Sequence, residues 1–161
     1  MSYFHTNNGE QGKTGNYKFS PKKPVRSFRD LEVYQKALEC SVLISSDVAP
    51  RAKEFGYLHH DAMLQCALSV PLLVAEAHSL RFADFALALG YIEKAMSSCN
   101  KAVVYLDQVK GLYGTKANPD LLEDIASRYV FTRLKMFRLE RSWRKFMDRD
   151  KQDGVVNSDI K

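Results

Sequence analysis

Apolar residues recur every three or four positions in four long stretches of the chain, the spacing of helices packed on one side. The first predicted helix begins at Ser27, where Ser27-Phe28-Arg29-Asp30 forms a variant capping box with Asp in place of Glu. Pro50 is expected to end this helix. Its apolar positions are Phe28, Leu31, Tyr34, Leu38, Val42 and then Ser45 or Val48.

The second predicted helix follows Gly56, and apolar residues surround most of its circumference, which is typical of a helix buried on several sides. Pro71 lies inside it and predicts a kink, because proline removes a backbone donor and clashes with the preceding turn. The third helix is expected to start between Ser79 and Phe82 and to end at Gly111. Its apolar positions are Phe85, Leu89, Ile92, Met96, Cys99, Val103 and Leu106.

The fourth predicted helix begins with Asn118 as N-cap and Pro119 in its first turn, and it runs to about Asp148. About thirty residues at 1.5 Å each give a rod of about 45 Å, longer than the first two helices, so its end is expected to project. Its apolar positions are Leu122, Ile125, Tyr129, Thr132, Met136, Leu139, Trp143 and Phe146.

No strand-like alternation is present, so the pattern predicts an all-α protein: an antiparallel up-down four-helix bundle with a long basic C-terminal helix. The bundle is expected to span residues 27–150. Residues 1–26 form a polar, basic tail that is expected to be disordered, and residues 151–161 are expected to fray.

Charge is distributed unevenly over these segments. Residues 28–127 carry nine basic and thirteen acidic residues, whereas residues 128–151 carry nine basic and three acidic residues, a net charge of +6. This asymmetry favours a localised anionic partner such as nucleic acid or an acidic protein surface. Alternatives are a solvated helix face, pairing with acidic groups of the same bundle, or an anionic lipid surface. The candidate binding residues are Arg128, Arg133, Lys135, Arg138, Arg141, Arg144, Lys145 and Arg149.

The sequence gives little support for a metal site, a catalytic carboxylate pair, a disulfide or a membrane span. The adjacent residues His59 and His60 diverge on a helix, so no metal site is expected, and Glu76 has no second carboxylate at catalytic spacing. The three cysteines contain no CxxC pair and are expected to be free. The most apolar stretch, residues 62–77, is short for a membrane span, and the N-terminus lacks a secretory signal pattern. We therefore expect a cytoplasmic protein that is not an enzyme and needs no cofactor.

Two segments resemble a known family. Residues 65–77, QCALSVPLLVAEA, resemble the central motif R-A-A-x-S-I-P-A-N-I-A-E-G of four-helix-bundle proteins associated with 23S rRNA intervening sequences. Residues 28–37, FRDLEVYQKA, resemble that family's opening F-x-D-L-x-V-x-x-K-A, and Asp84-Phe85 fits its E-F pair. Gln65, Leu73 and Ala77 depart from the Arg, Asn and Gly of the motif. The similarity covers roughly residues 27–110.

These departures and the basic fourth helix make the chain more similar to a second branch of that superfamily, the accessory variability determinants of diversity-generating retroelements. The resemblance implies a non-enzymatic accessory protein that forms a homopentameric ring. It also implies binding to a reverse transcriptase and to RNA or DNA without strong sequence preference. The alternative is an intervening-sequence-type bundle that acts as a structural or protein-interaction module without nucleic-acid binding.

Overall fold

The computed structural model describes the backbone of residues 25–156 and the side chains of residues 25–149. All long elements in this range are helical, which confirms the all-α class. The α-helices are α1 (Glu32–Leu43), α2 (Ala49–Glu54), α3 (His60–Leu80), α4 (Phe85–Tyr113) and α5 (Pro119–Val156). The predictions of a disordered tail and a frayed end concern residues that lie largely outside the described range.

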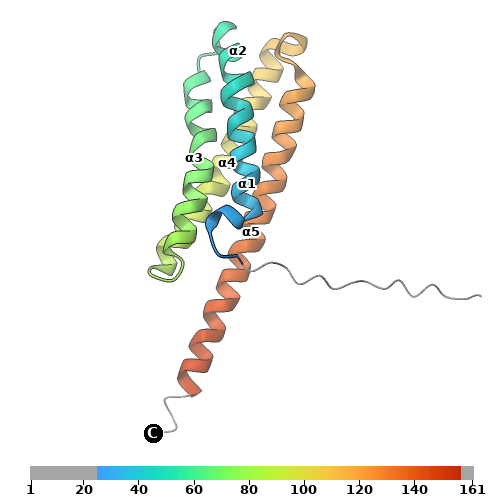
Figure 1. Cartoon of the computed structure of the whole chain (residues 1–161). Coiled ribbons are helices and arrows are strands. Elements are labelled where there is room, and N and C mark those ends of the chain that lie inside the picture. Colours follow the sequence, from blue (N-terminus) through green and yellow to red (C-terminus); the bar gives the residue numbers. More distant parts are fainter. Residues whose placement is uncertain (1–24, 157–161) are drawn as a thin grey trace, which may run out of the picture.

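The long helices lie side by side, with α3 in contact with α1 and α4, and with α5 in contact with α4 and α1 (Figure 1). A π-helical segment, Ile44–Val48, joins α1 to α2, so the three form one continuous rod. The helices bury a single cluster of apolar residues between them. The largest fully buried side chains include Ile44, Met63, Ile92, Leu106, Leu122, Ile125, Tyr129 and Met136.

The capping box at Ser27 is present, but it caps a shorter element than predicted. The Ser27 hydroxyl accepts from the Arg29 amide, and the Asp30 carboxylate accepts from the Ser27 amide at 2.9 Å. These bonds close a 3-10 turn, Phe28–Asp30, after which Leu31 is extended and α1 begins at Glu32. The start of the first helix at Ser27 was therefore wrong by five residues.

Pro50 does not end the first helix, contrary to the prediction. The π-helical segment Ile44–Val48 comes just before it, and Pro50 falls in the first turn of α2. The Ala49 amide, at the start of α2, donates to the Ile44 carbonyl oxygen, so Pro50 lies inside a continuous helical rod. A proline there removes one amide donor, and a wider turn just before it gives the ring room. The wider π turn thus carries the rod past the proline to Glu54.

The buried face of α1 also differs from the predicted one. Leu38 and Val42 are 42% and 55% exposed, whereas Ala37, Cys40 and Ile44 are fully buried. Small residues at Ala37 and Cys40 allow close approach of the neighbouring helices. The predicted apolar positions were therefore right at Leu31 and Val48, which are buried, and wrong at Leu38 and Val42.

The third helix passes through Gly111 and ends at Tyr113, so Gly111 was the wrong terminator. Gly114 ends it, with φ of 54° and ψ of −131°, a backbone conformation that side-chain-bearing residues rarely adopt. The predicted entry into α5 is confirmed, because the Leu121 amide donates to Asn118 Oδ1 and Pro119 is the first helical residue.

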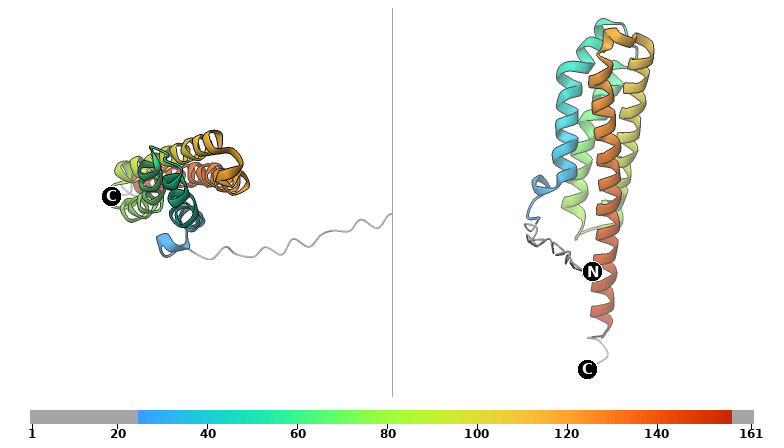
Figure 2. Two further views of the ribbon diagram at one scale, coloured as in Figure 1. Left: turned by 90° about the horizontal axis from the view of Figure 1, so that it is seen from above. Right: turned by 90° about the vertical axis from the view of Figure 1, so that its right-hand side faces the viewer.

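Helix α5 is 38 residues long and ends at Val156, eight residues later than predicted. Its C-terminal part extends past the ends of the other helices, as expected from its length (Figures 1 and 2). Among the described helices, only α3 is long and apolar enough to cross a membrane by length and composition. The core helix of a soluble protein passes the same test, and α3 packs here against α1 and α4.

Candidate nucleic-acid interface

The basic residues of α5 lie on a helix whose apolar side is packed in the core. Leu122, Ile125, Tyr129 and Met136 are buried on that side. At 100° per residue, Arg138, Arg141, Lys145 and Arg149 fall on the opposite side of the helix. Each of these four is exposed. The predicted separation of an apolar and a cationic side is thus present.

Three of the eight candidate residues are held in ion pairs with acidic residues of the fold. Arg128 Nε lies 2.9 Å from Asp124 Oδ2, and its Nη1 lies 3.8 Å from Glu39. The hydrogen bond to Asp124 raises the pKa of Arg128. Lys135 pairs with Glu32 and lies over the Phe131 ring at 4.7 Å. The contacts with Glu39 and Glu32 join α5 to α1.

Arg144 is the third residue held within the fold. Its Nε and Nη2 donate to Glu140 Oε1 at 3.0 Å and 2.7 Å, and Nη2 lies 3.7 Å from Glu93 on α4. The Glu140 carboxylate is buried, so this contact neutralises a charge that has lost water. Pairing with acidic groups of the same chain, one of the alternatives from the sequence, therefore applies to Arg128, Lys135 and Arg144.

The other five candidates form no ion pair among the described side chains. They are Arg133, Arg138, Arg141, Lys145 and Arg149. Arg133 differs from the rest because it lies toward α4. Burial raises the pKa of the Cys99 thiol to about 12, and the nearby Arg133 guanidinium opposes that rise. The remaining four, Arg138, Arg141, Lys145 and Arg149, are called the distal basic face below.

The outward side of α5 changes character along its length. Before the distal basic face it carries Val130, Phe131, Leu134 and Phe137, which are 58%, 51%, 42% and 45% exposed. Leu134 follows Val130 by four residues and Phe131 by three, and Phe137 follows Leu134 by three, so the four side chains share one side of α5, named the apolar stripe below. Arg141 lies over the Phe137 ring at 5.9 Å, where the stripe meets the basic face. The apolar pattern of the sequence did not single out these residues.

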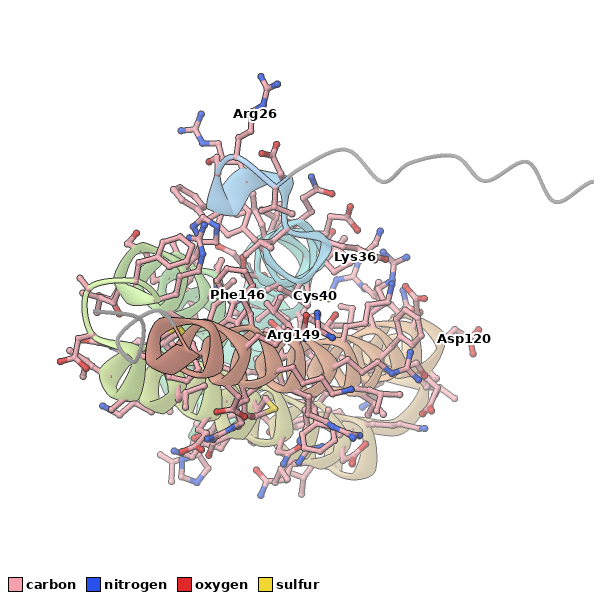
Figure 3. The ribbon with its side chains drawn as sticks, turned by 90° about the horizontal axis from the view of Figure 1, so that it is seen from below. Arg26, Lys36, Cys40, Asp120, Phe146 and Arg149 are labelled. Atoms are coloured by element: carbon pink, nitrogen blue, oxygen red, sulfur yellow. The ribbon has the colours of Figure 1, made fainter. Side chains whose placement is uncertain are left out.

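An aromatic groove next to the distal basic face was missed from the sequence. It has a volume of about 360 Å³ and lies between the α3–α4 turn and α5. Trp143 and Phe146 had been placed on the core seam, but Phe146 is 52% exposed. Phe82, on the other side of the groove, is 69% exposed. Figure 3 shows Phe146 and Arg149 together at the far end of α5. Only the great length of the fourth helix signalled that its last apolar residues lie at the edge of the core.

The histidines and cysteines do not form a reactive cluster within the described residues. The His59 ring lies near Tyr57 and Tyr105, whereas His60 Nδ1 lies 2.9 Å from Asp61. The two rings thus have separate surroundings, as expected from their adjacent positions. The three cysteines are free, as predicted: Cys40, Cys66 and Cys99.

Glu76 is exposed on α3, and no ion pair joins it to any described side chain. Comparisons of the chain with protein-family models, with curated proteins and with solved structures find no match.

Proposed function

We propose that this chain is a non-enzymatic accessory protein that binds nucleic acid through the distal basic face of α5. The observation that carries this proposal is the set of four exposed cations on one helix side, Arg138, Arg141, Lys145 and Arg149, none paired with an acidic group among the described side chains. Cations that are not already neutralised are free to replace the counterions of a phosphate backbone. Three of the four are arginines, which favour two-point contacts to phosphate oxygens.

We further propose the antiparallel up-down arrangement of the helices, which two sets of ion pairs support. Lys110 pairs with Glu123 at one end of the α4–α5 contact, and Glu93 lies near Arg144 at the other. Residue numbers thus rise along one helix as they fall along its neighbour. On the other side of α5, Glu32 with Lys135 and Glu39 with Arg128 follow the same order.

The proposal includes a homo-oligomeric ring, as the family resemblance implies. The apolar stripe on α5 supports a contact with a second copy, because contiguous exposed apolar surface marks interaction sites. Leu68 and Leu72 on α3 are also 44% and 65% exposed, so the apolar character of α3 is not fully satisfied within one chain. A pentamer repeats the distal basic face, and weak phosphate contacts then add by avidity.

The protein partner in this proposal is a reverse transcriptase of a diversity-generating retroelement, with RNA or cDNA as the nucleic acid. This part is carried by the resemblance of residues 28–37 and 65–77. A neighbouring reverse-transcriptase gene with a template repeat supports it, and a location inside a ribosomal RNA gene contradicts it.

Fluorescence anisotropy with a labelled RNA or DNA of arbitrary sequence, measured over a salt series, tests the binding. Four phosphate contacts predict a slope of log K against log salt of about −3 for a single strand. The variant Arg138→Glu, Arg141→Glu, Lys145→Glu should lose binding without loss of helix content by circular dichroism. Arg144 is left intact because it neutralises Glu140.

A matched control is Arg51→Glu, Lys53→Glu, Lys116→Glu, which changes the net charge equally among exposed residues of α2 and the α4–α5 connection. It should bind within a few-fold of wild type. Equal losses in both variants would show a general charge effect, and binding that is insensitive to salt would contradict the phosphate contacts.

The second candidate function is a protein-interaction module without nucleic-acid binding. The apolar stripe favours it, since that surface suits protein contacts irrespective of phosphate. The anisotropy experiment separates the two, because the module binds no nucleic acid even at low salt.

A further inference from the structure

We propose that the aromatic groove beside the distal basic face holds an unpaired base, so that the protein binds single-stranded nucleic acid in preference to duplex. The inference rests on the proposed function and specifies its substrate class. The groove is lined by Val25, Arg81, Phe82, Phe85, Ser142, Trp143, Phe146 and Met147.

The groove offers aromatic rings that the fold leaves partly exposed. Phe82 and Phe146 have ring centroids 6.5 Å apart with an interplanar angle of 64°, so the two rings form a corner and not a closed stack. Both side chains are more than half exposed. Exposed aromatic rings beside cations are the recurrent surface on which proteins stack the bases of single strands.

Arg81 places a positively charged guanidinium in a fixed position inside this corner. Its Cζ lies 4.3 Å from the centroid of the Phe82 ring, and its Nη1 donates to the His78 carbonyl oxygen at 2.6 Å. The guanidinium is therefore fixed over the ring before any ligand arrives. A planar guanidinium stacks on bases as well as on rings, so it forms a second side of the base site.

The adjoining surface continues the groove toward the cations. Val25 lines both the aromatic groove and a second groove of about 410 Å³ that also contains Lys135, Arg138 and Leu139. On α5, Arg149 follows Phe146 by three residues, which places the two side chains next to each other. A strand whose phosphates follow Arg138, Lys145 and Arg149 thus passes the aromatic corner.

A duplex cannot use this site, because its bases are stacked and paired inside the helix. A single strand can turn one base out at little cost and place it against Phe82 and Arg81. The charge contacts are shared by both forms of nucleic acid. The aromatic groove alone therefore discriminates between them.

Trp143 gives a direct readout, because it lines the groove and is the only tryptophan in the chain. The full-length protein is titrated with a single-stranded oligothymidylate, with an abasic oligonucleotide of the same length, and with a duplex of that length. We expect the oligothymidylate to quench Trp143 and to bind about tenfold more tightly than the abasic strand. The abasic strand should bind through its phosphates and leave Trp143 unchanged.

The variant Phe82→Ala should reduce oligothymidylate affinity to that of the abasic strand. Phe82 lies in the exposed α3–α4 turn, so its removal leaves the core intact, which thermal unfolding verifies. The control Leu112→Ala removes a similarly exposed apolar side chain at the C-terminal end of α4 and should change neither affinity nor quenching.

Equal affinity for the abasic and base-containing strands, with unchanged Trp143 emission, overturns the base site and leaves phosphate binding in place. A duplex bound as tightly as the single strand also overturns it. Loss of all binding refutes the proposed function as well. Trp143 emission that changes with protein concentration but not with oligonucleotide assigns the groove to a second copy and overturns the proposal.

Discussion

Arg144 donates two hydrogen bonds to a single oxygen of Glu140, from Nε at 3.0 Å and from Nη2 at 2.7 Å, one helical turn apart on α5. The Glu140 side chain is 10% exposed, and Arg144 is its bonded partner. The basic residues of α5 therefore fall into two groups. Arg144 is held within the fold, whereas the residues of the distal basic face have no ion pair among the described side chains.

The variant Arg144→Ala should lower the free energy of unfolding by about 2 kcal/mol, because it leaves a buried carboxylate without its donor. Chemical denaturation monitored by circular dichroism measures the change. The neighbouring Lys145→Ala removes an exposed cation with no ion pair among the described residues, so it should change stability by less than about 0.5 kcal/mol. Similar losses in both variants would contradict the structural role of Arg144.

Two glycines three residues apart should respond in opposite ways to alanine. Gly111 lies inside α4 with open space around its Cα, so Gly111→Ala should raise stability by about 0.5–1 kcal/mol. Gly114 has φ of +54°, so Gly114→Ala should cost about 1–3 kcal/mol. Denaturant unfolding of the two variants compares them directly. A loss of stability in Gly111→Ala together with a gain in Gly114→Ala would place the end of α4 at Gly111.

The core thiols should be unreactive in the native protein. Burial raises the pKa of Cys40 to about 11 and that of Cys99 to about 12, so neither forms the nucleophilic thiolate near neutral pH. We expect a chromogenic thiol reagent to modify them only at the rate of unfolding. In denaturant all three cysteines of the chain should react at once. Fast native modification of Cys40 or Cys99 would show that the core opens there.

The protein should lose stability as the pH falls below 6.5, the ordinary pKa of histidine, because of His78. Burial lowers the His78 pKa, the Arg81 charge lowers it further, and Asp30 opposes the effect. The unfolded chain therefore binds more protons than the native one as pH falls through 6.5, which favours unfolding.

Thermal unfolding between about pH 7.5 and about pH 5.5 measures this effect, and His78→Gln serves as the reference because its side chain does not titrate. Wild type should lose more stability than His78→Gln over this interval. Equal losses of stability in wild type and in His78→Gln would show that other groups cause the pH dependence.

Self-association should depend on the apolar stripe of α5. Leu134→Lys places a charge in the centre of that stripe and should shift the mass measured by light scattering toward the 18.4 kDa monomer. Val42→Lys is the control, since Val42 is an exposed apolar residue like Leu134 but lies on α1. A wild-type protein of 18.4 kDa would refute the ring.

The core side of α5 follows from sequence because it depends on local periodicity. Leu122, Ile125, Tyr129, Thr132 and Met136 were predicted on one seam, and all are nearly fully buried. A run of large apolar side chains at helical spacing can be satisfied only by turning that side inward. The same local logic located the cap at Asn118.

Positions that depend on neighbouring helices required the tertiary structure. Cys40 is buried and Val42 exposed because small side chains admit a second helix, which the apolar pattern of one helix cannot reveal. Likewise, sequence defined one set of eight cations on α5, but it did not show that Glu32 on α1 neutralises Lys135. Arg128 and Arg144 pair at shorter distances with Asp124 and Glu140, one turn earlier on α5 itself, than with Glu39 and Glu93 on other helices. The Lys135 charge is occupied, and the corner of Phe82 and Phe146 is formed, only when segments distant in sequence meet, so packing determined these parts of the candidate site.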